Sequence, residues 1–207
     1  MSVLNNRPLA INNFLKLHGN KSIRRIIVSR IPVSGKVQYL AEIITLGQWS
    51  ANMKKLNYED VYHLFMIVEL DDGILFKIEK NSRVDITLNN NKLGDTMINI
   101  TDIDNTLNDM FDNAEKLYGN ERIYRYDPFK TNCQVLLIDL LTAINKITPE
   151  LRTYIMQQAS MLIENDLLKY LAKLGTDGIA RARYTIEGGK KTKRKINKRK
   201  IVKKILK

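Results

Sequence analysis

Residues 61 to 81 read VYHLFMIVELDDGILFKIEKN, and this stretch decides the fold. Its first ten residues are almost continuously apolar and rich in β-branched and aromatic side chains, which is typical of a strand covered on both faces. Asp71-Asp72-Gly73 then reverses the chain, and residues 74 to 81 alternate apolar with polar side chains. The pattern predicts an antiparallel β-hairpin whose second strand has one face in a core.

Other strand signals lie on both sides of this hairpin. Residues 23 to 30, IRRIIVSR, predict a short strand that is released by a turn at residues 32 to 35. A further strand at residues 84 to 88, followed by an Asn-rich turn at residues 89 to 91, extends the hairpin into a meander. We therefore expect a small antiparallel sheet.

Apolar residues at helical spacing predict that helices cover this sheet. Gly47 and Gly119 mark the ends of the first two expected helices. Thr148-Pro149-Glu150 combines an N-cap, a first-turn Pro and an acid, which together mark the start of the last expected helix. The expected helices span residues 37–44, 106–118, 133–145 and 149–174. The fold class is therefore α+β, with a small antiparallel sheet packed against helices.

The positive charge of the chain is concentrated at one end. The formal net charge is +12, but residues 190 to 207 contain eleven Lys or Arg and no acid, which leaves 23 basic against 22 acidic residues in the first 189. The length of 207 residues suits one domain with an appendage. We expect a domain at residues 1–187 and a basic tail at residues 188–207, either disordered or amphipathic.

The number of cysteines and the hydropathy of the chain indicate its cellular compartment. There is one cysteine, Cys133, so neither an internal disulfide nor a cysteine-rich metal site can form. No apolar run is long enough to span a membrane, and the N-terminal MSVLNNRPL lacks the apolar core of a signal peptide. We expect a soluble cytoplasmic protein with no transmembrane segment, no cofactor and no metal ion.

Cys133 and His63 are the candidate nucleophile and base. Asn132 is suited to cap a helix that begins at Cys133, and a sulfur at the positive end of a helix dipole has a lowered pKa. His63 lies in the first strand of the hairpin and can serve in acid–base work. Each residue taken alone is also compatible with a purely structural role, as a buried thiol or a core histidine.

The hairpin register selects a third residue. If Asp71-Asp72-Gly73 is a three-residue loop with Gly73 in the left-handed conformation, His63 faces Asn81 and has Glu79 as its diagonal neighbour. Glu79 could then accept the second imidazole proton and orient the ring, with Asn81 as the alternative orienter. Lys77 shares that face but has no acceptor. A two-residue loop would instead turn Ile78, Lys80 and Ser82 toward His63.

The residues around both side chains resemble a known family. Residues 114 to 141, AEKLYGNERIYRYDPFKTNCQVLLIDLL, resemble the segment of the lecithin:retinol acyltransferase-like proteins that runs from a helix ending in Gly to an Asn-Cys-Glu/Gln motif. Residues 63 to 73, HLFMIVELDDG, are similar to the strand of that family that opens with the catalytic His and ends in an Asp-Gly turn. The resemblance covers roughly residues 60 to 142 and implies a permuted, NlpC-type papain-like fold in which His precedes Cys.

The resemblance also implies an activity. Cys133 would attack an acyl carbonyl, His63 would shuttle the proton, and an acyl-thioester would form on the enzyme. The chain departs from the acyltransferases proper in having Lys77 in place of a second His, and Gln134-Val135 in place of Glu-His. We expect a cysteine-dependent hydrolase or acyltransferase that cleaves an acyl ester or an amide or peptide bond. The alternatives are a non-catalytic virion or nucleic-acid-associated interaction protein that retains the fold, and a membrane-bound lipid-modifying enzyme.

The basic tail suggests anionic partners. Its charges can neutralise phosphates of a nucleic acid without a fixed fold. Ile201, Val202, Ile205 and Leu206 could instead form the apolar stripe of a helix lying on an anionic membrane surface. A tail that only adds solubility is the third interpretation. Gly188-Gly189 ahead of the basic run resembles the processing sites and Lys-rich ends of large-DNA-virus proteins.

Overall fold

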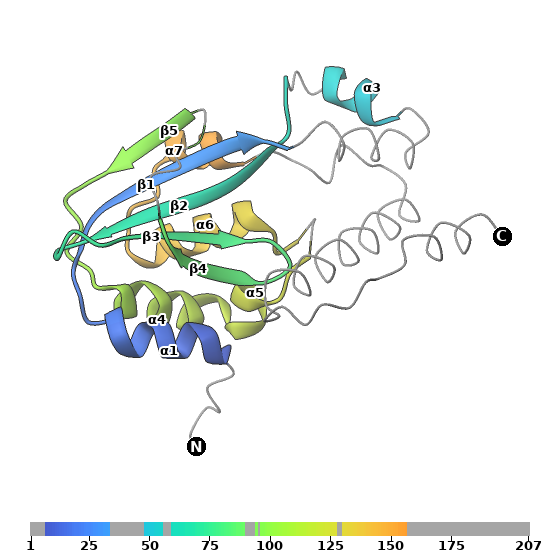
Figure 1. The fold of residues 1–207 in the computed structure, drawn as a ribbon. Helices are drawn as coiled ribbons and strands as arrows, with labels where there is room; N and C mark the ends of the chain where they lie inside the picture. The colour runs from blue at the N-terminus through green and yellow to red at the C-terminus, as the bar shows by residue number, and fades with distance from the viewer. Residues whose placement is uncertain are drawn as a thin grey trace, which may run out of the picture.

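The computed structural model describes residues 7–33, 48–55, 59–89, 94, 96–127 and 130–156. Over these residues the protein has an α+β architecture, with a five-stranded antiparallel sheet and six helices (Figure 1). In chain order the elements are α1 (Leu9–His18), β1 (Ile23–Pro32), α3 (Gln48–Lys55), β2 (Tyr62–Leu70), β3 (Leu75–Lys80), β4 (Val84–Leu88), β5 (Thr96–Ile100), α4 (Leu107–Tyr118), α5 (Asn120–Tyr124), α6 (Cys133–Ala143) and α7 (Pro149–Ile155). The expected fold class, a small antiparallel sheet packed against helices, is confirmed at this level.

The β2–β3 hairpin lies at the centre of the sheet, whose strand order is β4-β3-β2-β1-β5. Gly73 has φ +80°, a conformation that a left-handed turn position requires and that glycine adopts without a side-chain penalty. The three-residue loop sets the register in which Phe65 is opposite Glu79 and Val68 is opposite Phe76. The predicted register is therefore confirmed, and the two-residue alternative is wrong.

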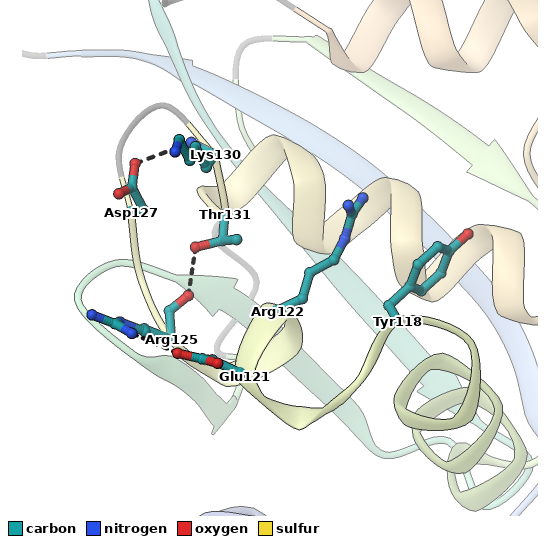
Figure 2. Close-up of a pocket in the computed structure, with 7 residues that line it drawn as sticks. All are labelled: Tyr118, Glu121, Arg122, Arg125, Asp127, Lys130 and Thr131. Carbon is teal, nitrogen blue, oxygen red and sulfur yellow. Dashed lines mark hydrogen bonds and ion pairs between the residues drawn. The ribbon is translucent and has the colours of Figure 1, made fainter. Parts of the chain in front are cut away.

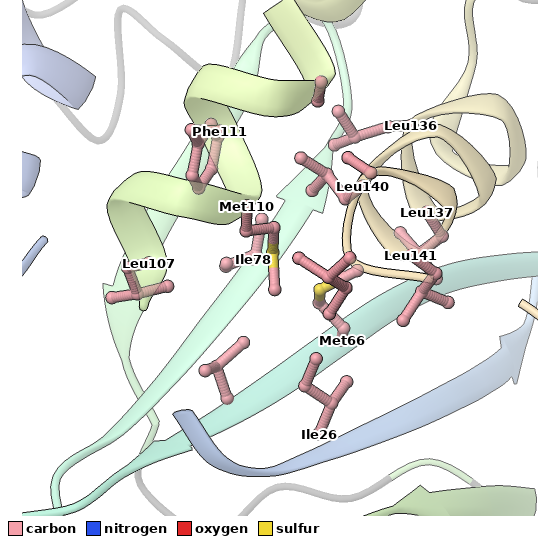
Figure 3. Packing of buried hydrophobic residues seen from close by; sticks show 14 of the residues in the cluster. Ile26, Met66, Ile78, Leu107, Met110, Phe111, Leu136, Leu137, Leu140 and Leu141 are labelled. Carbon is pink, nitrogen blue, oxygen red and sulfur yellow. The ribbon is translucent and has the colours of Figure 1, made fainter. Parts of the chain in front are cut away.

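Helices α1, α4, α5, α6 and α7 cover one face of the sheet. Even-numbered residues of the central strands, among them Met66 and Ile78, lie in the main core together with residues of α4 and α6. Figure 3 shows Met110 and Phe111 of α4 and Leu137 of α6 packed over these strands. The other face of β2 is also buried, through a smaller cluster of Ile27, Phe65 and Ile67. Burial on both faces explains why β2 is almost continuously apolar.

Several elements differ from the sequence-based expectations. α1, α3, β5 and the short helix α5, which follows Gly119, were not expected. The helix that starts at Pro149 ends at Ile155, because Met156 already has extended backbone, so the expectation of one helix to residue 174 is wrong. β5 is an edge strand with no fully buried side chain, and an edge strand needs little apolar patterning.

Three expectations lie outside the described residues. These are the helix at 37–44, the boundary between domain and tail at 187–188, and the tail itself.

Candidate active site

Cys133 is the first residue of α6, and local interactions place it there. The Oδ1 atom of Asn132 accepts a hydrogen bond from the backbone N–H of Val135 at 3.2 Å, which caps the helix. Before the cap, the hydroxyl of Thr131 donates to the carbonyl oxygen of Arg125 at 2.7 Å and ties down the segment that enters the helix. The sulfur therefore lies at the positive end of the α6 dipole, as the sequence predicted.

The sulfur of Cys133 lies against β2 near the point where β2 and β3 stop pairing. The β2–β3 ladder ends at Phe65 and Glu79, whereas β2 remains paired with β1 as far as Tyr62. Beyond the end of the β3 ladder, the backbone N–H of Leu64 donates a hydrogen bond to the sulfur of Cys133. The end of one ladder thus gives the thiol a place against the backbone of β2.

His63 and Glu79 meet on the neighbouring strands β2 and β3. Nε2 of His63 lies 3.0 Å from Oε2 of Glu79, and the other carboxylate oxygen of Glu79 lies 2.8 Å from Nζ of Lys77. The side chains of His63 and Glu79 are only 22% and 17% exposed, so the pair is shielded from solvent screening. The diagonal contact expected from the register is therefore present.

The thiol and the imidazole are hydrogen-bonded to each other and shift each other's pKa. Burial lowers the pKa of His63, but the hydrogen bonds and negative charges of Cys133 and Glu79 outweigh it and raise that pKa to about 9. Burial raises the pKa of Cys133, but His63 and the backbone N–H groups of Leu64 and Gln134 outweigh it, and the thiol pKa is lowered. Both shifts favour the thiolate–imidazolium form of the pair.

Glu79 stays ionised beside this pair. Burial raises the pKa of its carboxyl, but the hydrogen bonds from His63 and Lys77 outweigh that effect and lower the pKa to about 2. The carboxylate is thus a fixed negative charge that holds Nε2 of His63. This leaves Nδ1 as the ring nitrogen that can exchange a proton with the thiol.

Lys80 is a second cation near the thiol, and it was not expected in the site. It is 1% exposed, and its Nζ donates to the carbonyl oxygen of Arg122 at 2.9 Å. Burial lowers the pKa of Lys80 to about 8, although the negative charges of Asp139 and Cys133 act in the opposite direction. The signal for this residue is in the sequence, because the alternation of β3 places Lys80 on the core side, where Phe76 and Ile78 precede it.

Asp139 completes the charge balance on the helix side. This residue of α6 is 1% exposed and receives two hydrogen bonds from the guanidinium of Arg122, at 2.6 and 2.8 Å. A bidentate contact of this kind compensates the cost of burying the carboxylate. Through the half-exposed side chain of Arg122, this ion pair links α5 to α6, the helix that carries Cys133.

Among the predicted site residues, the structure brings Cys133, His63 and Glu79 together. Asn81 lies exposed in the β3–β4 turn, where its backbone N–H donates to the carbonyl of Arg83, and none of the hydrogen bonds of the described residues joins its side chain to His63. Of the two candidate orienters, Glu79 is therefore the one that contacts the imidazole ring of His63.

A pocket of about 470 Å³ opens near the segment that leads into α6, and its lining does not include Cys133, His63 or Glu79. Figure 2 shows Tyr118, Arg122 and Arg125 on one side of it and Asp127, Lys130 and Thr131 on the other. Its arginines are engaged, because Arg122 binds Asp139 and Arg125 pairs with Glu121. The pocket therefore belongs to the framework that holds the Cys133 segment.

Within the described residues, no group of three or more His, Cys, Asp or Glu side chains is placed to bind a metal ion. Likewise, none of the described helices has the length and apolarity needed to cross a bilayer.

Comparisons with protein-family models, with curated proteins and with solved structures found no match to this chain.

Proposed function

We propose that the protein is a cysteine-dependent hydrolase or acyltransferase that cleaves an acyl ester or an amide or peptide bond. The observation that carries this proposal is the arrangement of three side chains. A thiol at a helix N-terminus is hydrogen-bonded to His63, and His63 is held from behind by Glu79 at 3.0 Å. This is the nucleophile, base and orienter set of thiol catalysis.

The chemistry follows from the charge states. The Cys133 thiolate adds to the carbonyl carbon, and the oxygen of that carbonyl takes the negative charge. The backbone N–H of Cys133, which has no intrahelical acceptor in the first turn, can stabilise this oxyanion. His63 then gives its proton to the departing amine or alcohol, leaving an acyl-thioester on Cys133.

Release of the acyl group reverses the roles. His63, now neutral, removes a proton from water or from an acceptor amine or alcohol, which attacks the thioester carbonyl. The thiolate leaves as the acid or the new ester or amide forms, and His63 returns to its protonated state. Glu79 remains ionised throughout and keeps the imidazole oriented.

A permuted papain-like architecture is part of the same proposal. The catalytic strand β2 precedes the nucleophile helix α6 along the chain, and α6 packs against the sheet with its N-terminus at His63. The resemblance of residues 60 to 142 to the lecithin:retinol acyltransferase-like proteins supports this assignment. Because Lys77, Gln134 and Val135 differ from the residues of the acyltransferases proper, the proposed acyl substrates are not restricted to lipids.

The test is the ionisation of Cys133 and its acylation. We expect iodoacetamide to alkylate the thiol rapidly near neutral pH, and His63→Ala to slow this at least tenfold because the imidazolium that stabilises the thiolate is lost. Incubation with p-nitrophenyl acetate should give a burst of p-nitrophenol and one acetyl group on Cys133, seen by mass spectrometry, and Cys133→Ser should abolish both. A thiol that titrates near the ordinary value of about 8.5 in both the native chain and the His63 variant would sink the proposal.

The concentration of charge in the tail favours a second candidate. Eleven basic residues without an acid at residues 190 to 207 suit a nucleic-acid-associated interaction protein, for instance a virion component, that retains the fold without turnover. Such a protein would show no burst with the ester and would lose its binding with the tail.

A further inference from the structure

Arg30 lies near the C-terminal end of β1 and is held in a fixed position by three contacts. Its guanidinium carbon lies 4.4 Å from the ring centroid of Tyr62 and 4.5 Å from that of Tyr154 on α7. Its Nε donates to the hydroxyl of Thr96 at 2.8 Å, and that hydroxyl lies 3.0 Å from the hydroxyl of Tyr154. A guanidinium clamped between two aromatic faces keeps its plane and its terminal nitrogens in one orientation.

Arg30 differs from most described arginines in its lack of an acid. Carboxylates pair with Arg7, Arg24, Arg25, Arg83, Arg122 and Arg125. Within the described residues Arg30 has no carboxylate partner, and Nε is the only one of its guanidinium nitrogens that donates a hydrogen bond. The side chain of Arg30 is only partly buried.

This arrangement suits an anion. Two terminal nitrogens of a guanidinium match the spacing of two oxygens in a carboxylate or a phosphate. Because the side chain is already ordered by Tyr62, Tyr154 and Thr96, binding would not have to order it again, which is the advantage of preorganisation.

The clamp is next to the proposed catalytic residues. Arg30 is opposite Leu64 in the β1–β2 ladder, and the N–H of Leu64 donates to the sulfur of Cys133. Tyr62, one wall of the clamp, directly precedes His63 and packs against the same core cluster as Cys133 and Tyr154. Cross-strand and hydrogen-bond spacings place the Cα atom of Arg30 on the order of 10 Å from the sulfur.

We propose that Arg30 binds a negatively charged group, a carboxylate or a phosphate, on the substrate whose carbonyl Cys133 attacks. The inference rests on the proposed function and narrows its substrate class to anionic acyl compounds. The charged group would be separated from the attacked carbonyl by several bonds, because the clamp does not touch the sulfur. A neutral ester would then acylate Cys133 more slowly than an anionic ester with the same leaving group.

The test compares anionic and neutral alkylating probes that share one reactive group. The carboxylate probes are the N-iodoacetyl derivatives of glycine, β-alanine and γ-aminobutyric acid, each measured against its own carboxamide. The phosphate probe is N-iodoacetyl-ethanolamine phosphate, measured against N-iodoacetyl-ethanolamine. The quantity is the ratio of the two second-order rate constants for Cys133 in the full chain. A ratio cancels any change in thiol ionisation that is common to both probes.

The variant is Arg30→Gln, and the matched control is Arg24→Gln. Arg24→Gln removes the same charge from the same strand. The side chain of Arg24 is 67% exposed, and Arg24 lies six residues from Arg30, roughly 20 Å along β1. At 0.1 M salt that distance exceeds the screening length of about 10 Å. If Arg30→Gln does not fold, Arg30→Lys keeps the charge and removes the two-nitrogen fork, so it tests the same contact.

We expect at least one anionic probe to show a ratio about tenfold higher in the native chain and in Arg24→Gln than in Arg30→Gln. The series that gives the preference identifies the anion as carboxylate or phosphate. Equal ratios in the native and Arg30 proteins, or an equal fall in the Arg24 control, would overturn the inference.

The same data keep the two proposals apart. Neutral probes that react near pH 7 no faster than with an ordinary thiol would count against the proposed function. At about pH 9 even an unactivated thiol is largely ionised, so the ratio, and with it the role of Arg30, can still be measured.

Discussion

His63 lies between the Cys133 thiol and the Glu79 carboxylate, and its pKa depends on both. The pKa of His63 is raised from 6.5 to about 9, so the stability that its protonation contributes is complete below pH 6.5 and is lost as the pH rises through 9. The pKa of Glu79 is lowered from 4.5 to about 2, so its contribution is complete above pH 4.5 and is lost as the pH falls through 2. The pair therefore stabilises the fold most between pH 4.5 and 6.5.

Glu79→Gln should lower the pKa of His63 by about one unit or more, because a neutral amide replaces the carboxylate at Nε2. The ring proton resonances of His63 report this directly in an NMR titration, and the chain has only two histidines to assign. Glu69→Gln is the control, since Glu69 lies on β2 in ion pairs with Arg24 and Arg25, roughly 20 Å from His63. An unchanged titration of His63 in the Glu79 variant would mean that the carboxylate does not orient the ring in solution.

Lys80→Met separates the role of Lys80 in stability from its role at the thiol. A buried ammonium has a high desolvation cost, so its replacement by an apolar side chain of similar length should leave the free energy of unfolding unchanged or raised at pH 7. The thiol pKa of Cys133 should rise, because one of the two cations near the thiolate is lost.

The measurements for Lys80→Met are urea unfolding and the pH profile of iodoacetamide alkylation. Lys21→Met is the matched control, because Lys21 pairs with Asp72 at the opposite end of the hairpin. A loss of stability of several kcal/mol in Lys80→Met, with no change in the thiol pKa, would show that Lys80 is a structural residue only.

The first turn of α6 is the element that presents Cys133, the proposed nucleophile. Asn132→Ala should destabilise the protein by about 1 kcal/mol, because the N–H of Val135 loses its acceptor. Asn132→Ser should retain most of that stability, since a hydroxyl can also cap a helix. Thermal unfolding of both variants measures the difference. Equal stability of the Ala and Ser variants would mean that the cap contributes little and that the Cys133 segment is held by the Thr131 contact instead.

The β2–β3 hairpin is the element that sets the geometry of the base. Its loop length decides which side chains share a face with His63, and a shift of one residue would replace Glu79 by Ile78 or Lys80. Because β3 stops pairing with β2 after Glu79, the same hairpin also opens the place that the sulfur occupies. The orientation of His63 and the position of the Cys133 sulfur thus depend on one supersecondary unit.

At the scale of the whole molecule, the charge of the chain is divided between a body near neutrality and a basic tail. Removing residues 190 to 207 should abolish binding to duplex DNA and to anionic vesicles while leaving thiol alkylation unchanged. The reason is that the body has little net attraction for phosphate, whereas the tail holds eleven positive charges.

Binding of the full and truncated chains at two salt concentrations is the measurement for the tail. A steep loss of DNA affinity with salt indicates displaced counterions. Vesicle binding accompanied by an increase in helical circular dichroism would indicate a surface helix instead. If the truncated protein bound as well as the full chain, a basic patch on the folded body would have to be responsible.

The hairpin register, the start of α6 and the fold class could be predicted because each depends on residues close together in the chain. Asp71-Asp72-Gly73 sets the loop length through the left-handed conformation of Gly73, and the register follows from it. The cap of α6 joins Asn132 and Val135, three residues apart. Local conformational preferences act at this range and are visible in the sequence.

The contact between Cys133 and β2, the inward position of the charge on Lys80, and the Arg30 clamp depend on tertiary structure. Lys80 is compatible with the core only because the carbonyl of Arg122 and the carboxylate of Asp139 come from helices far along the chain. Arg30 acquires its walls when α7 docks against the sheet, which brings Tyr154 to Tyr62. Such contacts arise when apolar faces of distant elements pack together, and the spacing of residues along a sequence does not specify which faces will meet.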